Sequence, residues 1–271
     1  MEISFWKMHG AGNDFILVDD RGLTFPAGDR AWLAQVAGRR TGVGSEGIIL
    51  IQPAADADFR MRFFNPDGSE VDMCGNGARC VARLAHEIGA APACMRFNTG
   101  AGLLRAEVEG GLVRLHLTEP KDWRLRRTLR LSDRELPYSF VNSGVPHAVA
   151  EVADLAGLDV ARLGAEVRYH PDFAPKGTNA NFIAVTGPCA LRIRTYERGV
   201  EAETLACGTG IVAAGLLAGR LGRVTPPVAI TCASGDVLEV NYRLTPSGAE
   251  DVTLLGPAAH VFRGVLAYPA A

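Results

Sequence analysis

The sequence lacks any long apolar segment. No run approaches the roughly 20 consecutive apolar residues that a transmembrane helix needs, although 48% of the 271 residues are hydrophobic. The opening segment MEISFWKMHG has neither the basic region nor the apolar region of a signal peptide. We therefore expect a soluble, cytoplasmic protein with no membrane partner.

The chain is also poor in cysteine and in charge of one sign. Lys and Arg number 28 against 30 for Asp and Glu, without a run of like charge, so we expect no nucleic-acid partner. Six cysteines are too few for a disulfide scaffold, and no C-x-x-C or H-x-x-x-H spacing typical of metal or redox sites occurs. We expect no metal, and reduced thiols that are mostly buried in packing positions.

Short segments with alternating or β-branched character fill much of the chain, and turn sequences such as Asn65-Pro66-Asp67-Gly68 separate them. This pattern predicts a strand-rich protein. The expected strands are Ile3–Lys7, Phe15–Asp19, Gly47–Ile51, Asp58–Phe64, Leu103–Val108, Leu112–Leu117, Tyr138–Asn142, Asn181–Val185, Leu191–Tyr196, Val228–Cys232, Val237–Asn241, Val252–Leu255 and Val261–Leu266.

Helices are few, and two of them begin alike. The expected helices are Arg30–Arg40, a segment from Cys74 to about Ile88, Val160–Glu166, and a segment from Cys207 to about Arg220. One of these starts reads Cys-Gly-Asn-Gly from Cys74, and another reads Cys-Gly-Thr-Gly from Cys207. The two cysteines are 133 positions apart (207 minus 74), close to half the chain.

A motif repeated at this interval predicts an internal two-fold repeat. We expect an α+β fold of two similar, pseudo-symmetric domains, each a mostly antiparallel sheet wrapped around a central helix, with the active site in the cleft between them. The expected domains are residues 1–119 with Cys74 and residues 120–258 with Cys207. The linker should fall near Thr118–Arg130, where Pro, Asp, Trp and mixed charges interrupt the strand pattern.

The two Cys-Gly motifs suggest acid and base chemistry. A helix N-terminus carries unpaired N–H groups and partial positive charge, which attract a carboxylate and lower the pKa of a thiol. If both helix starts face one cleft, one thiolate can remove the α-proton of an amino acid while the other thiol protonates the opposite face. This scheme for inverting a carbon needs no cofactor such as pyridoxal phosphate.

A single cysteine before a glycine is more often a small buried hydrophobe at a turn. Two copies at matched positions favour the catalytic interpretation. The other cysteines have no such setting, and we interpret all four as structural: Cys80, Cys94, Cys189 and Cys232.

Five segments, spread through nearly the whole chain, give it a resemblance to a known family. They are His9–Phe15, Phe64–Glu70, the helix start at Cys74, Tyr196–Gly199 and the helix start at Cys207. With them, the sequence resembles diaminopimelate epimerase. The resemblance implies interconversion of LL- and meso-diaminopimelate in lysine and peptidoglycan precursor synthesis, a substrate enclosed between two domains, and a C-terminal strand, Ala259–Ala271, that returns to the first domain.

The resemblance also implies roles for individual residues. Cys74 and Cys207 match the acid and base, and His147 and Glu197 match a polar pair near them and the reacting amino group. Gly75, Asn76, Gly208 and Thr209 match the groups around the reacting carboxylate, while Asn13, Asn65, Asn179 and Arg198 match groups that recognise mainly the distal end of the substrate. We expect a homodimer.

Two positions depart from the family pattern. Members often have Asn where this chain has Val145, and some have Gln where it has Gly47. A racemase of another amino acid on the same scaffold therefore remains an alternative.

A thiol hydrolase and a non-enzymatic amino-acid binding protein are candidate functions of different classes. A hydrolase using one cysteine with His147 would leave the second motif unexplained, and a binding protein would make no use of thiols. The segment Gly42–Gly47 has the form G-x-G-x-x-G, but a helix precedes it and a strand follows, so we reject dinucleotide binding.

Overall fold

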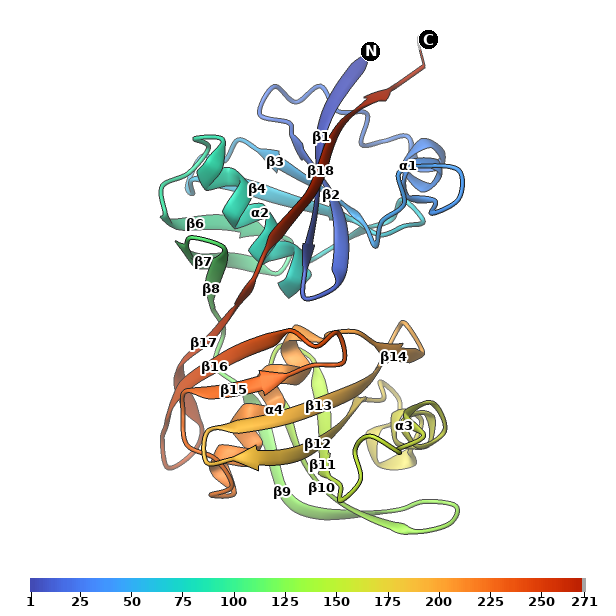
Figure 1. Ribbon diagram of the computed structural model, residues 1–271, viewed down its shortest axis with the longest axis vertical. Coiled ribbons are helices and arrows are strands. Elements are labelled where there is room, and N and C mark those ends of the chain that lie inside the picture. Colours follow the sequence, from blue (N-terminus) through green and yellow to red (C-terminus); the bar gives the residue numbers. More distant parts are fainter. Residues whose placement is uncertain (270–271) are drawn as a thin grey trace. The chain divides into compact units, whose positions relative to one another are not determined.

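The computed structural model describes residues 1–269, and the chain divides into two compact units (Figure 1). The first unit comprises Met1–Leu115 and Gly256–Ala271, and the second comprises His116–Leu255. Ala270 and Ala271, the last residues of the expected C-terminal strand, lie outside the described residues. Within residues 1–269, no helix has the length and apolar character required to cross a membrane.

The two units contain the same succession of strands and helices. The first has β1 (Glu2–Gly10), β2 (Asn13–Asp19), α1 (Arg30–Ala37), β3 (Ile48–Gln52), β4 (Phe59–Phe64), β5 (Glu70–Val71), α2 (Gly75–Glu87), β6 (Cys94–Thr99), β7 (Gly102–Glu109), β8 (Leu112–His116) and, from the end of the chain, β18 (Ala259–Ala267). The second has β9 (Lys121–Arg130), β10 (Glu135–Asn142), β11 (Pro146–Glu151), α3 (Val160–Arg168), the short 3-10 helix η1 (Pro171–Phe173), β12 (Asn179–Gly187), β13 (Ala190–Glu197), β14 (Ala202–Thr204), α4 (Gly208–Arg220), β15 (Val228–Thr231), β16 (Val237–Leu244) and β17 (Ala249–Pro257).

Strand pairing is also the same in both units. In the first, β1–β2, β3–β4 and β6–β7 are antiparallel pairs, whereas β2–β3 and β4–β6 are parallel. In the second, β10–β11, β12–β13 and β15–β16 are antiparallel, whereas β11–β12 and β13–β15 are parallel. An outer strand, β18 or β9, pairs with the first strand of each set. The predicted α+β class and internal repeat are confirmed.

Each sheet packs against two helices, so its central strands are buried on both faces. In β2, Ile16 belongs to the cluster that contains Leu33 of α1, whereas Phe15 on the other face lies next to the start of α2. All five residues of β3 are buried. At Gly77 in α2, an added Cβ would lie 2.7 Å from Cδ1 of Ile49, so a glycine lets the central helix approach the sheet.

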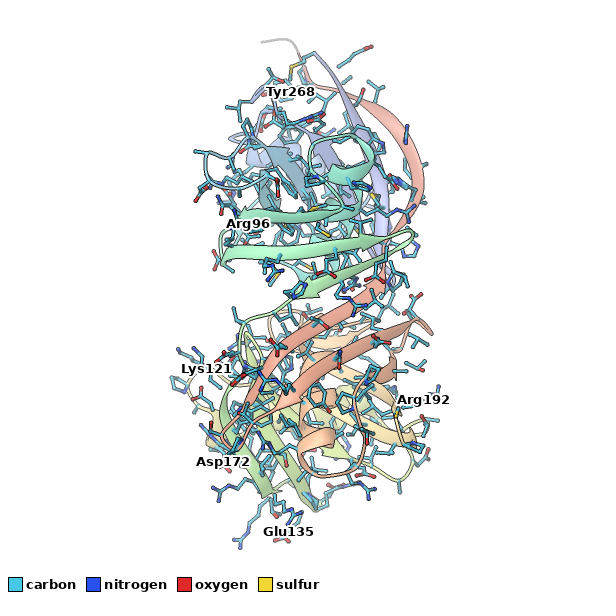
Figure 2. The ribbon with its side chains drawn as sticks, turned by 90° about the vertical axis from the view of Figure 1, so that its left-hand side faces the viewer. Arg96, Lys121, Glu135, Asp172, Arg192 and Tyr268 are labelled. Atoms are coloured by element: carbon cyan, nitrogen blue, oxygen red, sulfur yellow. The ribbon has the colours of Figure 1, made fainter. Side chains whose placement is uncertain are left out.

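The C-terminal strand helps to fix α1 in the first unit. Tyr268, labelled in Figure 2, packs edge-on against Trp32 with ring centroids 5.0 Å apart. Its hydroxyl donates to Oδ2 of Asp29 at 3.1 Å, and Oδ1 of the same carboxylate accepts from the N–H of Trp32 as the N-cap of α1. The residue after β18 is thus joined to the start of α1.

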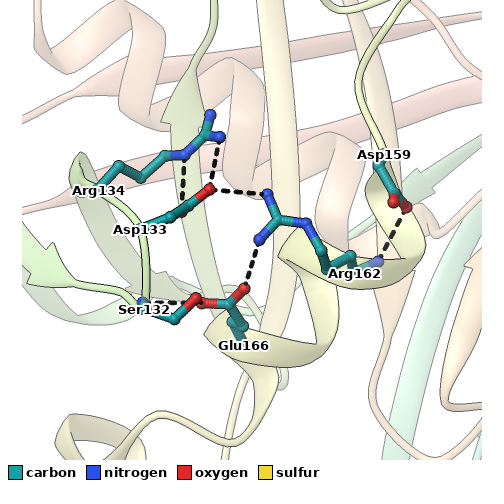
Figure 3. Close-up of polar contacts among 6 residues, drawn as sticks. All are labelled: Ser132, Asp133, Arg134, Asp159, Arg162 and Glu166. Carbon is teal, nitrogen blue, oxygen red and sulfur yellow. Dashed lines mark hydrogen bonds and ion pairs between the residues drawn. The ribbon is translucent and has the colours of Figure 1, made fainter.

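In the second unit, polar contacts tie the turn between β9 and β10 to α3 (Figure 3). Glu166 accepts hydrogen bonds from the N–H and the hydroxyl of Ser132, at 3.0 and 2.9 Å. Arg162 pairs with both Glu166 and Asp133, at 2.9 and 3.2 Å. Because α3 packs on β12 and β13, this network supports the position of these strands.

Some sequence predictions were wrong. The segment Thr118–Arg130 is not simply a linker, because Lys121–Arg130 forms β9; nearly all of its side chains are exposed or half-buried, so it shows no apolar alternation. The helix expected over Arg30–Arg40 ends at Ala37, where Gly38 turns to an extended backbone. Cys94 and Cys189 are exposed, so they are not buried packing residues.

Candidate active site

Cys74 is the residue immediately before α2. Its backbone is extended, with φ −135° and ψ 125°, and its carbonyl oxygen accepts the first helical bond from the N–H of Ala78 at 2.8 Å. The Cys74 side chain is half-buried. A thiol at this point lies in the positive field of the helix N-terminus, next to backbone N–H groups that the helix itself does not use.

Side-chain amides next to this helix start form a series of hydrogen bonds. Asn13 lies at the beginning of β2, directly after a two-residue turn in which Ala11 and Gly12 both have positive φ. Nδ2 of Asn76 donates to Oδ1 of Asn13, and Nδ2 of Asn13 donates to Oε2 of Glu46. Two predicted site residues, Asn13 and Asn76, are therefore in direct contact.

A buried arginine fixes the direction of these bonds. Arg79, one turn along α2, is fully buried, and its Nη2 donates to Oδ1 of Asn76 at 2.9 Å while its Nε donates to the carbonyl oxygen of Pro257 at 3.2 Å. Since a guanidinium can only donate, the amide oxygen of Asn76 must face Arg79 and its NH₂ group must face Asn13.

Charged groups beside Asn13 form a second network. Asp14 pairs with Lys7 at 2.6 Å and with Arg39 at 2.6 Å. Burial alone would raise the pKa of the Asp14 carboxyl, but the hydrogen bonds from Arg39 and Lys7 outweigh it and lower the pKa below the usual value. Asp14 is therefore a fixed anion that holds the β1–β2 turn in place.

Asn65 and Gly47 lie at the end of β4 and the beginning of β3. The carbonyl oxygen of Asn65 accepts from the N–H of Gly68 at 2.9 Å in a tight turn, and its Nδ2 donates weakly to Oγ of Ser69 at 3.4 Å. At Gly47, a Cβ would lie 2.3 Å from Cε2 of Phe63. The Phe63 ring thus occupies the space into which a glutamine side chain at position 47 would extend. This explains why the chain departs from the family pattern here.

Cys207 is the equivalent residue before α4. Its backbone is extended, with φ −107° and ψ 105°, and its carbonyl oxygen accepts from the N–H of Ile211 at 2.9 Å. Sγ of Cys207 lies 3.7 Å from Oγ1 of Thr209, and the carbonyl oxygen of Thr209 accepts from the hydroxyl of Ser143 at 2.8 Å. The loop before β11 therefore helps to hold the start of α4.

His147 links the second strand of this unit to the helix start. Its Nε2 lies 2.9 Å from Oγ1 of Thr209, and its Nδ1 lies 3.1 Å from Nδ2 of Asn181. The ring is completely buried, and this burial, with the charge of Arg198 acting in the same direction, lowers the pKa of His147 to about 3. His147 is neutral at physiological pH, and its Nε2 contacts the hydroxyl of Thr209.

Asn179, Glu197 and Arg198 meet where β12 and β13 adjoin. The register places Asn179 opposite His147 in the parallel β11–β12 pair, and Asn179 is the first residue of β12. Oδ1 of Asn179 accepts from the N–H of Arg198 at 2.8 Å, and its Nδ2 donates to the carbonyl oxygen of Pro146 at 2.9 Å. Oε2 of Glu197 accepts from the hydroxyl of Thr204 at 2.8 Å.

Three residues in these networks were missed from sequence: Glu46, Arg79 and Asn181. Arg79 is a charged residue between the buried Ala78 and Cys80 of a helix, and Asn181 is a polar residue between the buried Ala180 and Phe182 of a strand. Polar residues at such positions are a recognisable signal, because they are rarely buried without partners.

Comparison with known proteins gives full-length matches. A family model described as diaminopimelate epimerase matches residues 5–119 and 139–258. The diaminopimelate epimerase of Chlorobaculum tepidum is 44% identical over 263 residues, covering 96% of this chain and 99% of that protein. The diaminopimelate epimerase of Aquifex aeolicus is 40% identical over 276 residues, covering 97% and 98%.

Solved structures with lower sequence identity share the fold. A Bacillus anthracis phenazine biosynthesis protein of the PhzF family aligns with a TM-score of 0.74 at 16% identity, covering 99% of this chain and 100% of that one. A hydroxyproline epimerase from Agrobacterium vitis aligns with a TM-score of 0.69 at 19% identity, covering 98% and 92%.

Proposed function

Because the chain belongs to the diaminopimelate epimerase family, it is an isomerase that epimerises diaminopimelate, and we propose that Cys74 and Cys207 are its acid and base. The observation that carries this assignment is their equivalence: each is the residue before the central helix of its unit. An inversion needs one proton-transfer group on each face of the α-carbon, and two equivalent helix starts supply such a pair.

In the proposed mechanism, one cysteine is a thiolate and removes the α-proton of the substrate. The other is a thiol and delivers its proton to the opposite face, so that the two exchange protonation states in each turnover. This mechanism requires both helix starts to face one substrate. We propose that arrangement because the inversion needs it and because the chain belongs to this family. Neither step calls for pyridoxal phosphate or a metal.

The backbone at the helix starts can stabilise the negative charge that develops on the substrate. We assign the groups around the reacting carboxylate to Gly75 and Asn76 in one unit, and to Gly208 and Thr209 in the other. N–H groups in the first turn of a helix are directed outward and carry partial positive charge, so they favour a carboxylate whose electron density increases on deprotonation.

The remaining polar residues are assigned to recognition and to the protonation state of the cysteines. Asn13, Asn65, Asn179 and Arg198 would bind the distal amino-acid end, since amides and a guanidinium match its ammonium and carboxylate groups. Support comes from the hydrogen bond that the backbone N–H of Arg198 donates to Asn179, which orients the Asn179 amide and places it next to Arg198. His147 and Glu197 would lie near the reacting amino group.

The test is incubation of the purified protein with LL-diaminopimelate in deuterium oxide, without added cofactor. We expect meso-diaminopimelate to form with one solvent deuteron at the inverted carbon. Cleavage products would indicate a thiol hydrolase, and binding without deuterium incorporation would indicate a binding protein. Faster racemisation of alanine, proline or histidine would indicate another substrate on the same scaffold.

We also propose that the enzyme acts in the cytoplasm as a homodimer, in lysine and peptidoglycan precursor synthesis. The dimer is supported by three exposed apolar residues of β18, Val261, Phe262 and Val265, which are 55%, 47% and 59% exposed. Sedimentation of the wild type and of Val265→Lys would test it: the dimer should be weakened in the variant, and a monomeric wild type would contradict the proposal.

A further inference from the structure

We propose that Asn181 is a positioning residue for the reaction: it holds His147 in the tautomer with hydrogen on Nε2, and His147 thereby directs the hydroxyl hydrogen of Thr209 toward Sγ of Cys207. This inference rests on the proposed role of Cys207 as acid and base. It assigns a function to a strand residue that acts on the thiol through two intervening side chains.

The orientation of the Asn181 amide follows from its surroundings. Asn181 is 1% exposed, and its Nδ2 lies 2.9 Å from the carbonyl oxygen of Ala148, which can only accept. Its Oδ1 accepts from the hydroxyl of Thr195 at 3.0 Å. The nitrogen of the amide is therefore on the side of β11, and its second hydrogen is available to His147.

The tautomer of His147 follows from that hydrogen. Nδ2 of Asn181 lies 3.1 Å from Nδ1 of His147, so Nδ1 accepts and cannot itself carry a hydrogen. A neutral ring must then carry its hydrogen on Nε2. The buried position of the ring keeps it neutral, as the pKa of about 3 also indicates.

The direction of the Thr209 hydroxyl follows in turn. Nε2 of His147 is 2.9 Å from Oγ1 of Thr209, so the N–H donates and the oxygen accepts. The hydroxyl hydrogen is then available to Sγ of Cys207, which is 3.7 Å away and within the longer range of hydrogen bonds to sulfur. A donated hydrogen bond stabilises the thiolate relative to the thiol.

Two further contacts keep this series in place. The carbonyl oxygen of Thr209 accepts from Ser143 at 2.8 Å, which fixes the helix start against the loop before β11. At Gly210, a Cβ would lie 2.4 Å from Oδ1 of Asn181, so the absence of a side chain lets the amide lie against α4. The side chains of Asn181, His147, Thr209 and Cys207 are thus held by β12, β11 and the start of α4.

The first experiment reads the tautomer directly, by nitrogen NMR of protein labelled with ¹⁵N-histidine, with His147→Gln used to assign the signals. In the wild type, we expect Nε2 to be protonated and Nδ1 to be unprotonated. In Asn181→Asp, the carboxylate can only accept, so Nδ1 should become protonated. Asn241→Asp adds the same charge at an exposed position of β16 and should leave the His147 signals unchanged. A wild-type spectrum with hydrogen on Nδ1 would overturn the proposal.

The second experiment tests the link to the thiol. Alkylation of Cys207 by iodoacetamide is followed by peptide mass spectrometry at a fixed pH below the thiol pKa. Thr209→Val removes the hydroxyl but keeps the shape and the backbone N–H, and should slow alkylation about tenfold. Thr209→Ser keeps the hydroxyl and should stay within about twofold of the wild type. Equal alkylation rates for Thr209→Val and the wild type would contradict the link between the Thr209 hydroxyl and the thiol.

The third experiment connects Asn181 to turnover. At a pH where NMR shows the ring of Asn181→Asp to be neutral, its Nε2 should accept the Thr209 hydroxyl hydrogen and draw it away from Cys207. Asn181→Asp and Thr209→Val should then each lower kcat, and the double variant should lose little more than either alone. Losses that multiply would show that Asn181 acts independently. If the tautomer and alkylation results hold but diaminopimelate is not epimerised, the proposed function fails and the positioning role does not.

Discussion

Cys74 and Cys207 occupy the same position in two units with the same order and pairing of strands. Each is the extended residue from which a central helix of 13 residues begins, and each has a carbonyl oxygen that accepts the first helical hydrogen bond. Their surroundings differ. Asn76, after Cys74, bonds to Asn13 and Arg79, whereas Thr209, after Cys207, bonds to His147. The two cysteines therefore have equivalent backbones, whereas the residues two positions after them have different polar partners.

Replacing either cysteine by alanine should abolish epimerisation, because inversion needs a group on each face. We expect Cys74→Ala and Cys207→Ala each to lower turnover by at least about 10²-fold, measured by chiral analysis of the product. The matched control is Cys94→Ala at an exposed position of β6, which should turn over like the wild type. Wild-type turnover in either active-site variant would refute the two-base mechanism.

Removing Arg198 should weaken recognition of the distal end of the substrate. For Arg198→Ala we expect a loss of about 2–5 kcal/mol in transition-state binding if a buried charge pair is broken, appearing mainly as a raised KM. Arg192→Ala removes the same side chain from an exposed position of β13, labelled in Figure 2, and is the control. If Arg198→Ala has the same KM as the wild type, Arg198 does not bind the substrate.

Adding a methyl group at Gly210 should destabilise the second unit. A Cβ there would lie 2.4 Å from Oδ1 of Asn181, whereas at Gly28 it would meet nothing within 4 Å. We expect Gly210→Ala to lower the free energy of unfolding by about 1–3 kcal/mol, measured by urea denaturation, and Gly28→Ala to change it little. Similar stabilities of the two variants would contradict the close approach of α4 to β12.

His147 should make stability dependent on pH. Burial lowers its pKa in the folded protein from 6.5 to about 3, so between these values the unfolded chain binds a proton that the folded chain does not. The free energy of unfolding should fall as pH decreases through this range, by up to about 1.4 kcal/mol per pH unit. Urea denaturation at pH 7 and pH 5 should show a smaller difference for His147→Gln than for the wild type. An identical difference would mean that folding does not lower the pKa of the ring.

The helix starts and most strands could be predicted from the sequence because their signals are local. Cys-Gly before an apolar segment marks where α2 and α4 begin, and alternation marks strands such as β13. By contrast, β9 was missed because it presents mainly charged side chains to solvent, and its backbone is irregular, with positive φ at Asp122 and Arg126. The signal that β9 lacks is an alternation of buried and exposed side chains, not strand propensity.

The polar networks could be predicted only in part, because they depend on pairings between distant segments. The resemblance selected His147, Asn179 and Thr209, but nothing local shows that Asn181 bonds to His147, which lies 34 positions away. That contact arises from the parallel register of β11 and β12, which aligns Asn181 two residues beyond the His147–Asn179 pair. Similarly, Arg79 meets Pro257, 178 positions away, only because the end of the chain returns to the first unit.

That return has a consequence for synthesis on the ribosome. The second unit is one continuous stretch, His116–Leu255, and all of its strands are synthesised before Ala259–Ala267. The first unit is made first but lacks β18, the partner of β1, until Ala259–Ala267 has left the exit tunnel. Because long-range strand pairing has to wait for both strands, the sheet of the first unit is completed only after the second unit has been synthesised.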